Sequence, residues 1–340
     1  MHSKTKTGIL LVNLGTPDSP STADVRKYLR EFLLDPRVID INPIGRFLLV
    51  NLIIAPFRSP KSAKLYKEIW SEKGSPLLFY GIEVKNLLQK ELGDDFVVEL
   101  GMRYQSPSLE EAVQKFKSHS FDKVIILPLF PQYASASTGS VYEKIMKITS
   151  KWEFFPSIEF ISDFHQNEQF LDAFANLGKK YLKAEEYDHI LFSFHGLPER
   201  QIQKTDCSNL CLVSKDCCES YNEKNRFCYK ASSFETARQI AKRLNLKADD
   251  YTISFQSRLG REEWIKPYTT DTLKDFATRG IKKVLVFCPA FICDCLETVY
   301  EVSVELNEEF RQNGGDKVQL VEGLNSNPDW IKAIRSILQV

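Results

Sequence analysis

The sequence has no excess of charge of either sign and no segment long enough to cross a membrane as a helix. Its 340 residues carry 45 Lys or Arg and 45 Asp or Glu, so no net field draws the chain to nucleic acid or anionic lipid. The longest apolar run is residues 47–57, whereas a membrane-spanning helix needs about 20 residues. The polar start, residues 1–7, fits no signal peptide. We therefore expect a cytoplasmic protein without a nucleic-acid partner.

Two common signatures of nucleotide binding are also missing. No G-x-G-x-x-G follows the first predicted strand, and no G-x-x-x-x-G-K-[ST] occurs, which argues against a nucleotide-dependent enzyme.

Basic residues are missing from one stretch in particular. Residues 284–310 contain six acids and no Lys or Arg. At α-helical spacing five of these acids share one face: Asp294, Glu297, Glu301, Glu305 and Glu308. Like charges at this spacing destabilise a helix. We interpret this acid stripe as a path for a cation or for protons, with Glu297 and Glu301 as its centre.

Short β-branched runs alternate with helical patterns along the whole chain. Four strands are predicted in each half: residues 8–15, 96–103, 123–130, 157–164, 189–196, 251–257, 283–291 and 318–324. This alternation is typical of parallel sheets that helices cover on both faces. The halves also echo each other, since LVNLGTP (11–17) matches FSFHGLP (192–198) in pattern. The sequence therefore predicts a duplicated α/β domain.

We place the N-terminal domain at residues 1–165 and the C-terminal domain at residues 187–324, and we expect the last helix, within 325–340, to pack back on the N-terminal domain.

Segment 44–60, which contains the apolar run, is either a buried helix on the sheet or an exposed lip that touches membrane or an apolar ligand. Segment 204–230 holds five of the eight cysteines. In a cytosolic chain this clustering indicates metal or redox chemistry.

Ligands of open parallel sheets bind beyond the carboxyl ends of the strands. His195 ends one predicted strand, and Glu297 follows another in the same half. An imidazole that faces a carboxylate can bind a divalent cation or transfer protons near neutral pH. Other polar and aromatic residues at such ends predict a cleft between the domains for a large, flat ligand with carboxylates. They are Arg103, Tyr104, Tyr133, Ser137, Thr138, Gln256 and Trp264.

These pieces resemble the ferrochelatase family, whose members insert Fe(2+) into a porphyrin. The resemblance covers essentially the whole chain in family order, through LVNLGTPDSP, GMRYQSP, PQYASASTGS, SFHGLPER, FQSRLGREEWIKP, DCLETVYE and LNSNPDW. It implies a type II chelatase fold, with two Rossmann-like domains that each contain a four-stranded parallel sheet, and a porphyrin in the cleft between them. It also implies that His195 and Glu297 are the catalytic pair and that Glu301 handles the metal with them.

The resemblance implies haem as product, in the last step of haem biosynthesis, and the apolar segment 47–57 favours protoporphyrin IX as substrate. The alternatives are a non-catalytic haem carrier, or a chelatase for another tetrapyrrole or metal such as coproporphyrin III or cobalt. We expect a monomer or homodimer with peripheral contact to the cytoplasmic membrane face.

Two features depart from the family pattern. Cys295 stands where many members have His, and the cysteines lie in an insertion rather than a tail. Some members carry an iron–sulfur cluster. Four of five cysteines are therefore candidate ligands of a [2Fe–2S] cluster: Cys207, Cys211, Cys217, Cys218 and Cys228. A zinc ion on four thiolates, or no metal, is the other interpretation.

Overall fold

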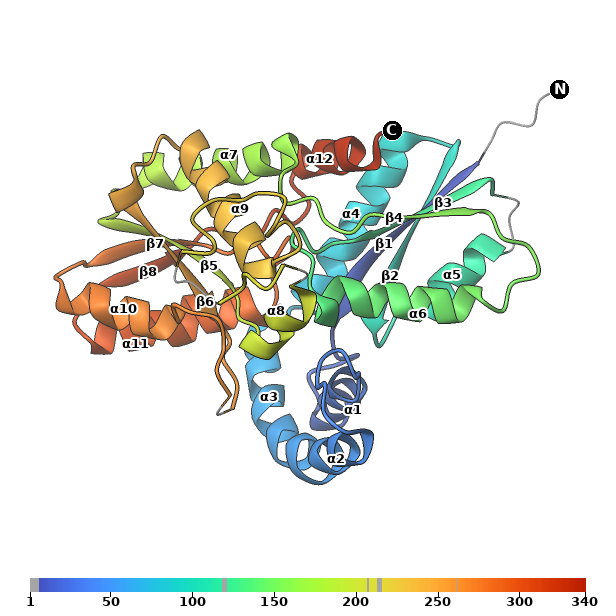
Figure 1. The fold of residues 1–340 in the computed structure, drawn as a ribbon, viewed down its shortest axis with the longest axis horizontal. Helices are drawn as coiled ribbons and strands as arrows, with labels where there is room; N and C mark the ends of the chain where they lie inside the picture. The colour runs from blue at the N-terminus through green and yellow to red at the C-terminus, as the bar shows by residue number, and fades with distance from the viewer. Residues whose placement is uncertain (1–5, 118–120, 207, 213–215, 261) are drawn as a thin grey trace. The chain divides into compact units, whose positions relative to one another are not determined.

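A computed structural model describes residues 6–117, 121–206, 208–212, 216–260 and 262–340 (Figure 1). The chain forms two compact units. Unit 1 is Met1–Phe130 with Ala134–Asp163, and unit 2 is Pro131–Tyr133 with Phe164–Val340. In the described part of the chain no helix is both long and apolar enough to cross a membrane.

Unit 1 contains a four-stranded parallel sheet in the order β2-β1-β3-β4. The strands are β1 (Thr7–Gly15), β2 (Phe96–Tyr104), β3 (Lys123–Pro128) and β4 (Ser157–Phe160). Its α-helices are α1 (Thr22–Leu33), α2 (Pro43–Leu48), α3 (Ala55–Ile69), α4 (Pro76–Leu92), α5 (Leu109–Lys117) and α6 (Ser140–Thr149). Two π-helical segments, η1 (Leu49–Ile54) and η2 (Ser135–Gly139), precede α3 and α6.

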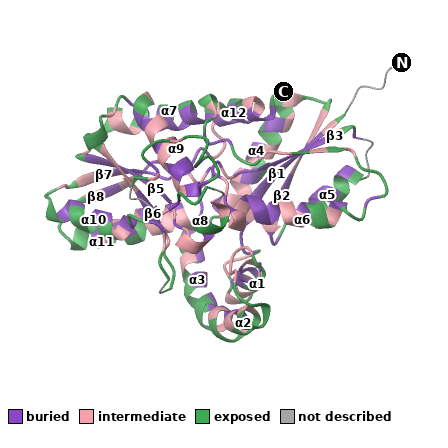
Figure 2. Cartoon of the chain, viewed as in Figure 1, coloured by how far each residue is buried: buried purple, intermediate pink, exposed green. Residues whose placement is uncertain are grey.

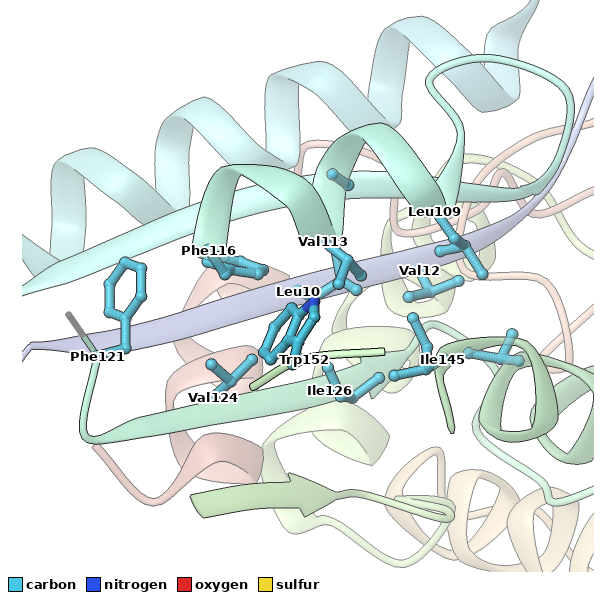
Figure 3. Packing of buried hydrophobic residues seen from close by; sticks show 12 residues of the cluster. Leu10, Val12, Leu109, Val113, Phe116, Phe121, Val124, Ile126, Ile145 and Trp152 are labelled. Atoms are coloured by element: carbon cyan, nitrogen blue, oxygen red, sulfur yellow. The ribbon is translucent and has the colours of Figure 1, made fainter. Parts of the chain in front are cut away.

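Helices cover both faces of this sheet because successive strand residues point to opposite sides. On one face, Leu10 and Val12 of β1 pack with Val113 and Phe116 of α5, as Figure 3 shows. On the other face, Leu100 of β2 lies against α4, where Gly81 leaves only enough room for it. The buried strands, purple in Figure 2, have the continuous apolar pattern that a sheet covered on both faces requires.

Unit 2 repeats this architecture with a parallel sheet in the order β6-β5-β7-β8. The strands are β5 (His189–His195), β6 (Tyr251–Gln256), β7 (Lys283–Phe287) and β8 (Lys317–Leu320). Its α-helices are α7 (Glu168–Ala184), α8 (Glu199–Thr205), α9 (Tyr229–Arg243), α10 (Thr269–Thr278), α11 (Asn307–Gln312) and α12 (Pro328–Leu338). A short 3-10 helix, η3 (Ala248–Asp250), and a long π-helix, η4 (Leu296–Leu306), complete the unit.

The duplicated α/β fold predicted from the sequence is confirmed. In both units the first strand lies between the second and the third, and a π-helix follows the third strand, η2 in unit 1 and η4 in unit 2. Helix α12 lies against α7 within unit 2, where the Trp330 ring meets Phe170. Its packing on the N-terminal domain stays a prediction.

The acid stripe was expected on an α-helix, and that expectation is wrong for Glu297, Glu301 and Glu305. Residues 296–306 form the π-helix η4, whose hydrogen bonds join residues five apart. π-Helical turns are rare and occur mostly at functional sites.

Candidate functional site

His195 is the last residue of β5 and lies in register with Gln256, the last residue of β6. Its Nδ1 is 2.6 Å from the carbonyl oxygen of Gly196. Since a carbonyl oxygen only accepts, Nδ1 carries the proton and Nε2 keeps a free lone pair. Burial lowers the pKa of His195, and the nearby Glu297 carboxylate raises it only in part. The imidazole is therefore neutral at neutral pH, with Nε2 ready to accept a proton or bind a metal.

The turn after His195 is tightly packed. The Gly196 N–H donates to the Gln256 carbonyl over 2.8 Å. A Cβ on Gly196 would lie 2.8 Å from that carbonyl and 3.0 Å from the Trp264 ring. Glycine is thus required here for close approach. The rings of Trp264 and Phe291 both have their centroids 6.3 Å from that of His195, so His195 lies between two aromatic side chains.

Glu297 lies in the first turn of η4 and is half-buried. The Gln256 side chain donates from Nε2 to its backbone carbonyl over 2.8 Å, which ties η4 to the end of β6. The Cys295 thiol, in the position where many family members have His, hydrogen-bonds to Glu297. Burial, and then the Glu297 charge, raise the pKa of this thiol well above its usual value. Cys295 therefore stays protonated and acts as a donor to Glu297.

Glu301 is held by donors from the end of β6. The backbone N–H of Ser257 is 2.8 Å from Oε1, and the Ser257 hydroxyl is 2.6 Å from Oε2. Burial nevertheless raises the pKa of Glu301 to about 7, and the charge of Glu297 adds to the shift. A carboxyl group with a pKa near 7 can both take up and release protons at neutral pH.

The members of the acid stripe differ in exposure. Asp294 is buried and has a structural role, since its carboxylate accepts from Thr298, Asn325 and the Gly323 N–H. Glu297 and Glu301 are half-buried, and Glu305 and Glu308 are exposed. The stripe therefore runs from the candidate site to solvent, without Asp294 as a free member.

Gln256 was expected to contact substrate, and the structure gives its side chain other partners. Its carboxamide is buried, accepts from Ser193 over 2.7 Å and donates to Glu297. Trp264 is half-buried, and its Nε1 has no hydrogen-bond partner among the described residues. Tyr133, also in unit 2, is half-buried.

The four predicted residues of unit 1 fall into two sets. Arg103 is held by Asp35, with 2.5 Å between Nη2 and Oδ2 and only 14% and 4% of the two side chains exposed. The Tyr104 hydroxyl donates to the same carboxylate over 2.9 Å, and its side chain has no exposed surface. Thr138 is fully buried and Ser137 half-buried. Neither Tyr104 nor Thr138 is therefore accessible to a ligand in this structure.

Three comparisons place the chain among known proteins. A family model described as Ferrochelatase matches residues 6–340. A ferrochelatase of Legionella pneumophila (strain Lens) is 46% identical over 332 residues, 97% of this chain and 98% of that protein. A ferrochelatase of Coxiella burnetii (strain Dugway 5J108-111) is 43% identical over 334 residues, 98% of this chain and 93% of that protein. The chain belongs to the ferrochelatase family.

This ferrochelatase is therefore an enzyme that inserts iron into a porphyrin for haem synthesis. Its fold is similar to that of SirB from Bacillus subtilis, solved with Fe3+, at a TM-score of 0.52 and 12% identity over 98% of this chain and 95% of that one. At this identity the likeness supports the fold alone, which is the predicted type II chelatase fold.

The Cys-rich insertion of this ferrochelatase brings four thiols together. The thiols of Cys211 and Cys218 both hydrogen-bond to the sulfur of Cys228, and 3.7 Å separate the sulfurs of Cys217 and Cys218. Cys207 lies outside the described residues. Among the described residues, no group of three or more His, Cys, Asp or Glu side chains already stands in the geometry of a metal site.

The apolar run of the ferrochelatase, residues 47–57, is exposed and not a buried helix. Six large apolar side chains of α2, η1 and the start of α3 are mostly exposed, up to 74% for Phe57: Ile44, Phe47, Leu48, Leu52, Ile53 and Phe57. We call this set the apolar lip. The exposure argues against a buried helix, and contact of the lip with membrane or an apolar ligand stays a prediction.

Some residues with clear partners in these sites were missed in the sequence. Asp35 and Ser140, which hold Arg103, follow ordinary helical patterns, and Ser257 is the last residue of a predicted strand. The motif GMRY gives no signal that its Arg is paired, since Asp35 lies 68 residues earlier.

Proposed function

We propose that the chain inserts Fe(2+) into protoporphyrin IX and that His195 and Glu297 are its catalytic pair. The observation that carries this proposal is the bond from His195 Nδ1 to the Gly196 carbonyl, which leaves Nε2 unprotonated beside an acid. A porphyrin accepts a metal only after its two pyrrole N–H protons leave. Nε2 of His195 holds one proton, so His195 takes up these protons one at a time or leaves the second to Glu297. Binding of the macrocycle in a bent form turns the nitrogen lone pairs toward His195.

Glu297 presents the substrate Fe(2+) or receives the second proton, and Glu301 passes protons on to solvent. A pKa of about 7 for Glu301 supports this role, because uptake and release are then nearly balanced at neutral pH. The exposed Glu305 and Glu308 continue the same path outward.

Arg103, Tyr133, Ser137 and Trp264 remain proposed substrate contacts, because each has exposed surface. We now assign Gln256 and Tyr104 to positioning instead, through Glu297 and Asp35. Thr138, which is fully buried, is left out of the proposed contacts. A binding site between the two domains stays a prediction.

The test of the catalytic pair uses His195→Ala and, as a control, His189→Gln at the other end of β5, where Gln can keep the bond to Thr252. We expect His195→Ala to lose metal insertion but to bind protoporphyrin IX with unchanged affinity, measured by fluorescence. Near-normal turnover in His195→Ala would overturn the proposal. Parallel assays with coproporphyrin III and with cobalt decide between the substrates, and bound but unmetallated porphyrin would favour a carrier.

We also propose that four cysteines of the insertion hold a [2Fe–2S] cluster. The convergence of Cys211, Cys217, Cys218 and Cys228 supports this, with Cys207 as a further candidate. Hydrogen bonds from the Cys211 and Cys218 thiols lower the pKa of Cys228, which favours the thiolate, the form that binds metal. Charge-transfer bands in protein purified without air would support the cluster. A colourless protein with bound zinc, or with neither metal, would overturn it.

The apolar lip is proposed to rest on the cytoplasmic membrane face, where an apolar porphyrin would also partition. Its six large apolar side chains lie close together in sequence and are exposed, and exposed apolar patches mark sites of membrane or protein contact. The cytoplasmic location and the choice between monomer and homodimer stay predictions.

A further inference from the structure

Tyr229 links the Cys-rich insertion to His195. It is the first residue of α9, directly after Cys228, and its side chain is buried. Its hydroxyl donates to the backbone carbonyl of His195 over 2.9 Å. This carbonyl stands at the carboxyl end of β5 and belongs to the last residue pair of the β5–β6 ladder, His195 with Gln256. The Tyr229 donor is a side chain of α9, outside the sheet.

The other end of this link is anchored in the cysteine cluster. Cys228 is the N-cap residue of α9, and the thiols of Cys211 and Cys218 hydrogen-bond to its sulfur. Arg238, two turns further along α9, donates to the Cys218 carbonyl over 2.9 Å. The start of α9 is thus held by the same residues that hold the insertion together. Any movement of Cys228 moves the adjacent Tyr229.

The peptide that follows the one bonded to Tyr229 carries the hydrogen bond that fixes the His195 imidazole. The carbonyl of His195 belongs to the peptide that leads into Gly196, and the carbonyl of Gly196 accepts from Nδ1 of His195. Two hydrogen bonds in series therefore run from the Tyr229 hydroxyl to the ring. Gln256 and Trp264 confine Gly196. A rotation of the peptide between His195 and Gly196 therefore changes the position of the Gly196 carbonyl.

We infer that Tyr229 is a positioning residue for iron insertion, through which the state of the Cys-rich insertion sets the orientation of His195. This rests on the proposed catalytic role of His195. The insertion then acts on the reaction from a distance and contributes no group to the chemistry.

The first test compares Tyr229→Phe with a matched control, Tyr181→Phe. Both remove one hydroxyl from unit 2, and the Tyr181 hydroxyl donates to the Glu322 side chain at the surface. We expect Tyr229→Phe to lower kcat about three- to tenfold, the effect of losing one buried hydrogen bond. The KM values for porphyrin and Fe(2+) should stay within about twofold, because ground-state binding does not use this bond. An unchanged kcat in Tyr229→Phe would overturn the inference, as would an equal loss in Tyr181→Phe.

The second test observes His195 directly and needs no turnover. The chain has five histidines, and the imidazole ¹⁵N signals of His195 are identified by their absence in His195→Ala. We expect Cys228→Ser to shift these signals in the wild-type background but not when combined with Tyr229→Phe. Equal shifts in both backgrounds, or no shift in either, would overturn the coupling.

The two tests also separate this inference from the proposed role of His195. Normal turnover in His195→Ala would end the catalytic role, yet the ¹⁵N shifts would still report whether Tyr229 couples the insertion to the ring. A loss of turnover in His195→Ala together with unshifted signals would keep the catalytic role and end the coupling.

Discussion

Ser257 holds both oxygens of the Glu301 carboxylate, with its backbone N–H on one and its hydroxyl on the other. It can do so because its backbone is left-handed, with φ at 65°. Such a conformation is uncommon for a residue other than glycine and costs about 1–3 kcal/mol. The strain is located one residue beyond the end of β6, beside His195, which indicates that the turn is shaped for the site.

Loss of the Ser257 hydroxyl is expected to lower activity without loss of fold. Ser257→Ala keeps the N–H donor and removes the hydroxyl, so kcat should fall about tenfold, as for a hydrogen bond to a charged group. Ser257→Gly removes the same hydroxyl and relieves the strain, so it should be more stable than Ser257→Ala by about 1 kcal/mol. Steady-state kinetics and urea unfolding check both. If the two variants differ in kcat, backbone strain and not the hydroxyl sets the activity.

Glu301 should make the stability of the protein depend on pH. Its pKa of about 7 exceeds that of an unfolded Glu, about 4.3, because burial penalises the charge. Between these values the native state binds more protons than the unfolded state, so this contribution to the free energy of unfolding falls as pH rises. Glu301→Gln lacks it. The free energy of unfolding of the variant, relative to that of the wild type, should therefore rise from about pH 5 to about pH 8 in urea titrations. Glu305→Gln, at an exposed position, is the control. A difference in free energy of unfolding between Glu301→Gln and the wild type that does not change with pH would contradict the assignment.

The fold was predictable because its signals are local and repeated. Each of the eight predicted strands is present, within a few residues, because buried parallel strands need β-branched runs and the connections need helices. The helix type of residues 296–306 was not predictable. It depends on contacts with residues far away in the sequence: Gln256 bonds to the Glu297 carbonyl, and Asn325 bonds to Asp294 just before η4.

The sequence predicts residues at strand ends as site candidates but does not report which of them packing buries, and the catalytic pair stays a prediction. His195 and Glu297 could be named because each follows a strand end. Tyr104 and Gln256 also lie at strand ends, but the structure buries them against partners far away in the sequence, Asp35 and Ser193. No local pattern reports such a partner. Tyr229 was missed for the same reason, since 34 residues separate it from His195.

The close approach at Gly196 predicts a large effect from a single methyl group. In Gly196→Ala the Cβ would meet the Gln256 carbonyl at 2.8 Å and the Trp264 ring at 3.0 Å. Backbone cannot move aside as a flexible side chain can, so unfolding stability should fall by about 1–3 kcal/mol, and the His195 ring should shift. The control is Gly45→Ala in α2, where nothing lies within 4 Å of the new Cβ. It should leave stability unchanged or raise it slightly, because Ala favours helices. Equal effects of the two changes in chemical denaturation would contradict this account.

Charge placed on the apolar lip should weaken membrane binding and leave the fold intact. Phe57 exposes 74% of its side chain, so Phe57→Glu removes little buried area in the folded protein. In contact with lipid the same change loses about 1.5–3 kcal/mol of favourable transfer free energy of the Phe side chain and adds a charge. The affinity for vesicles should therefore fall about tenfold or more. Co-sedimentation with phosphatidylcholine vesicles measures it, with Ile82→Glu, an exposed position on α4, as the matched control. Binding by the wild type that Phe57→Glu leaves unchanged would show that another surface meets the membrane. If the wild type does not bind vesicles, the lip has a different partner, and the porphyrin itself is then the apolar ligand to test with Phe57→Glu.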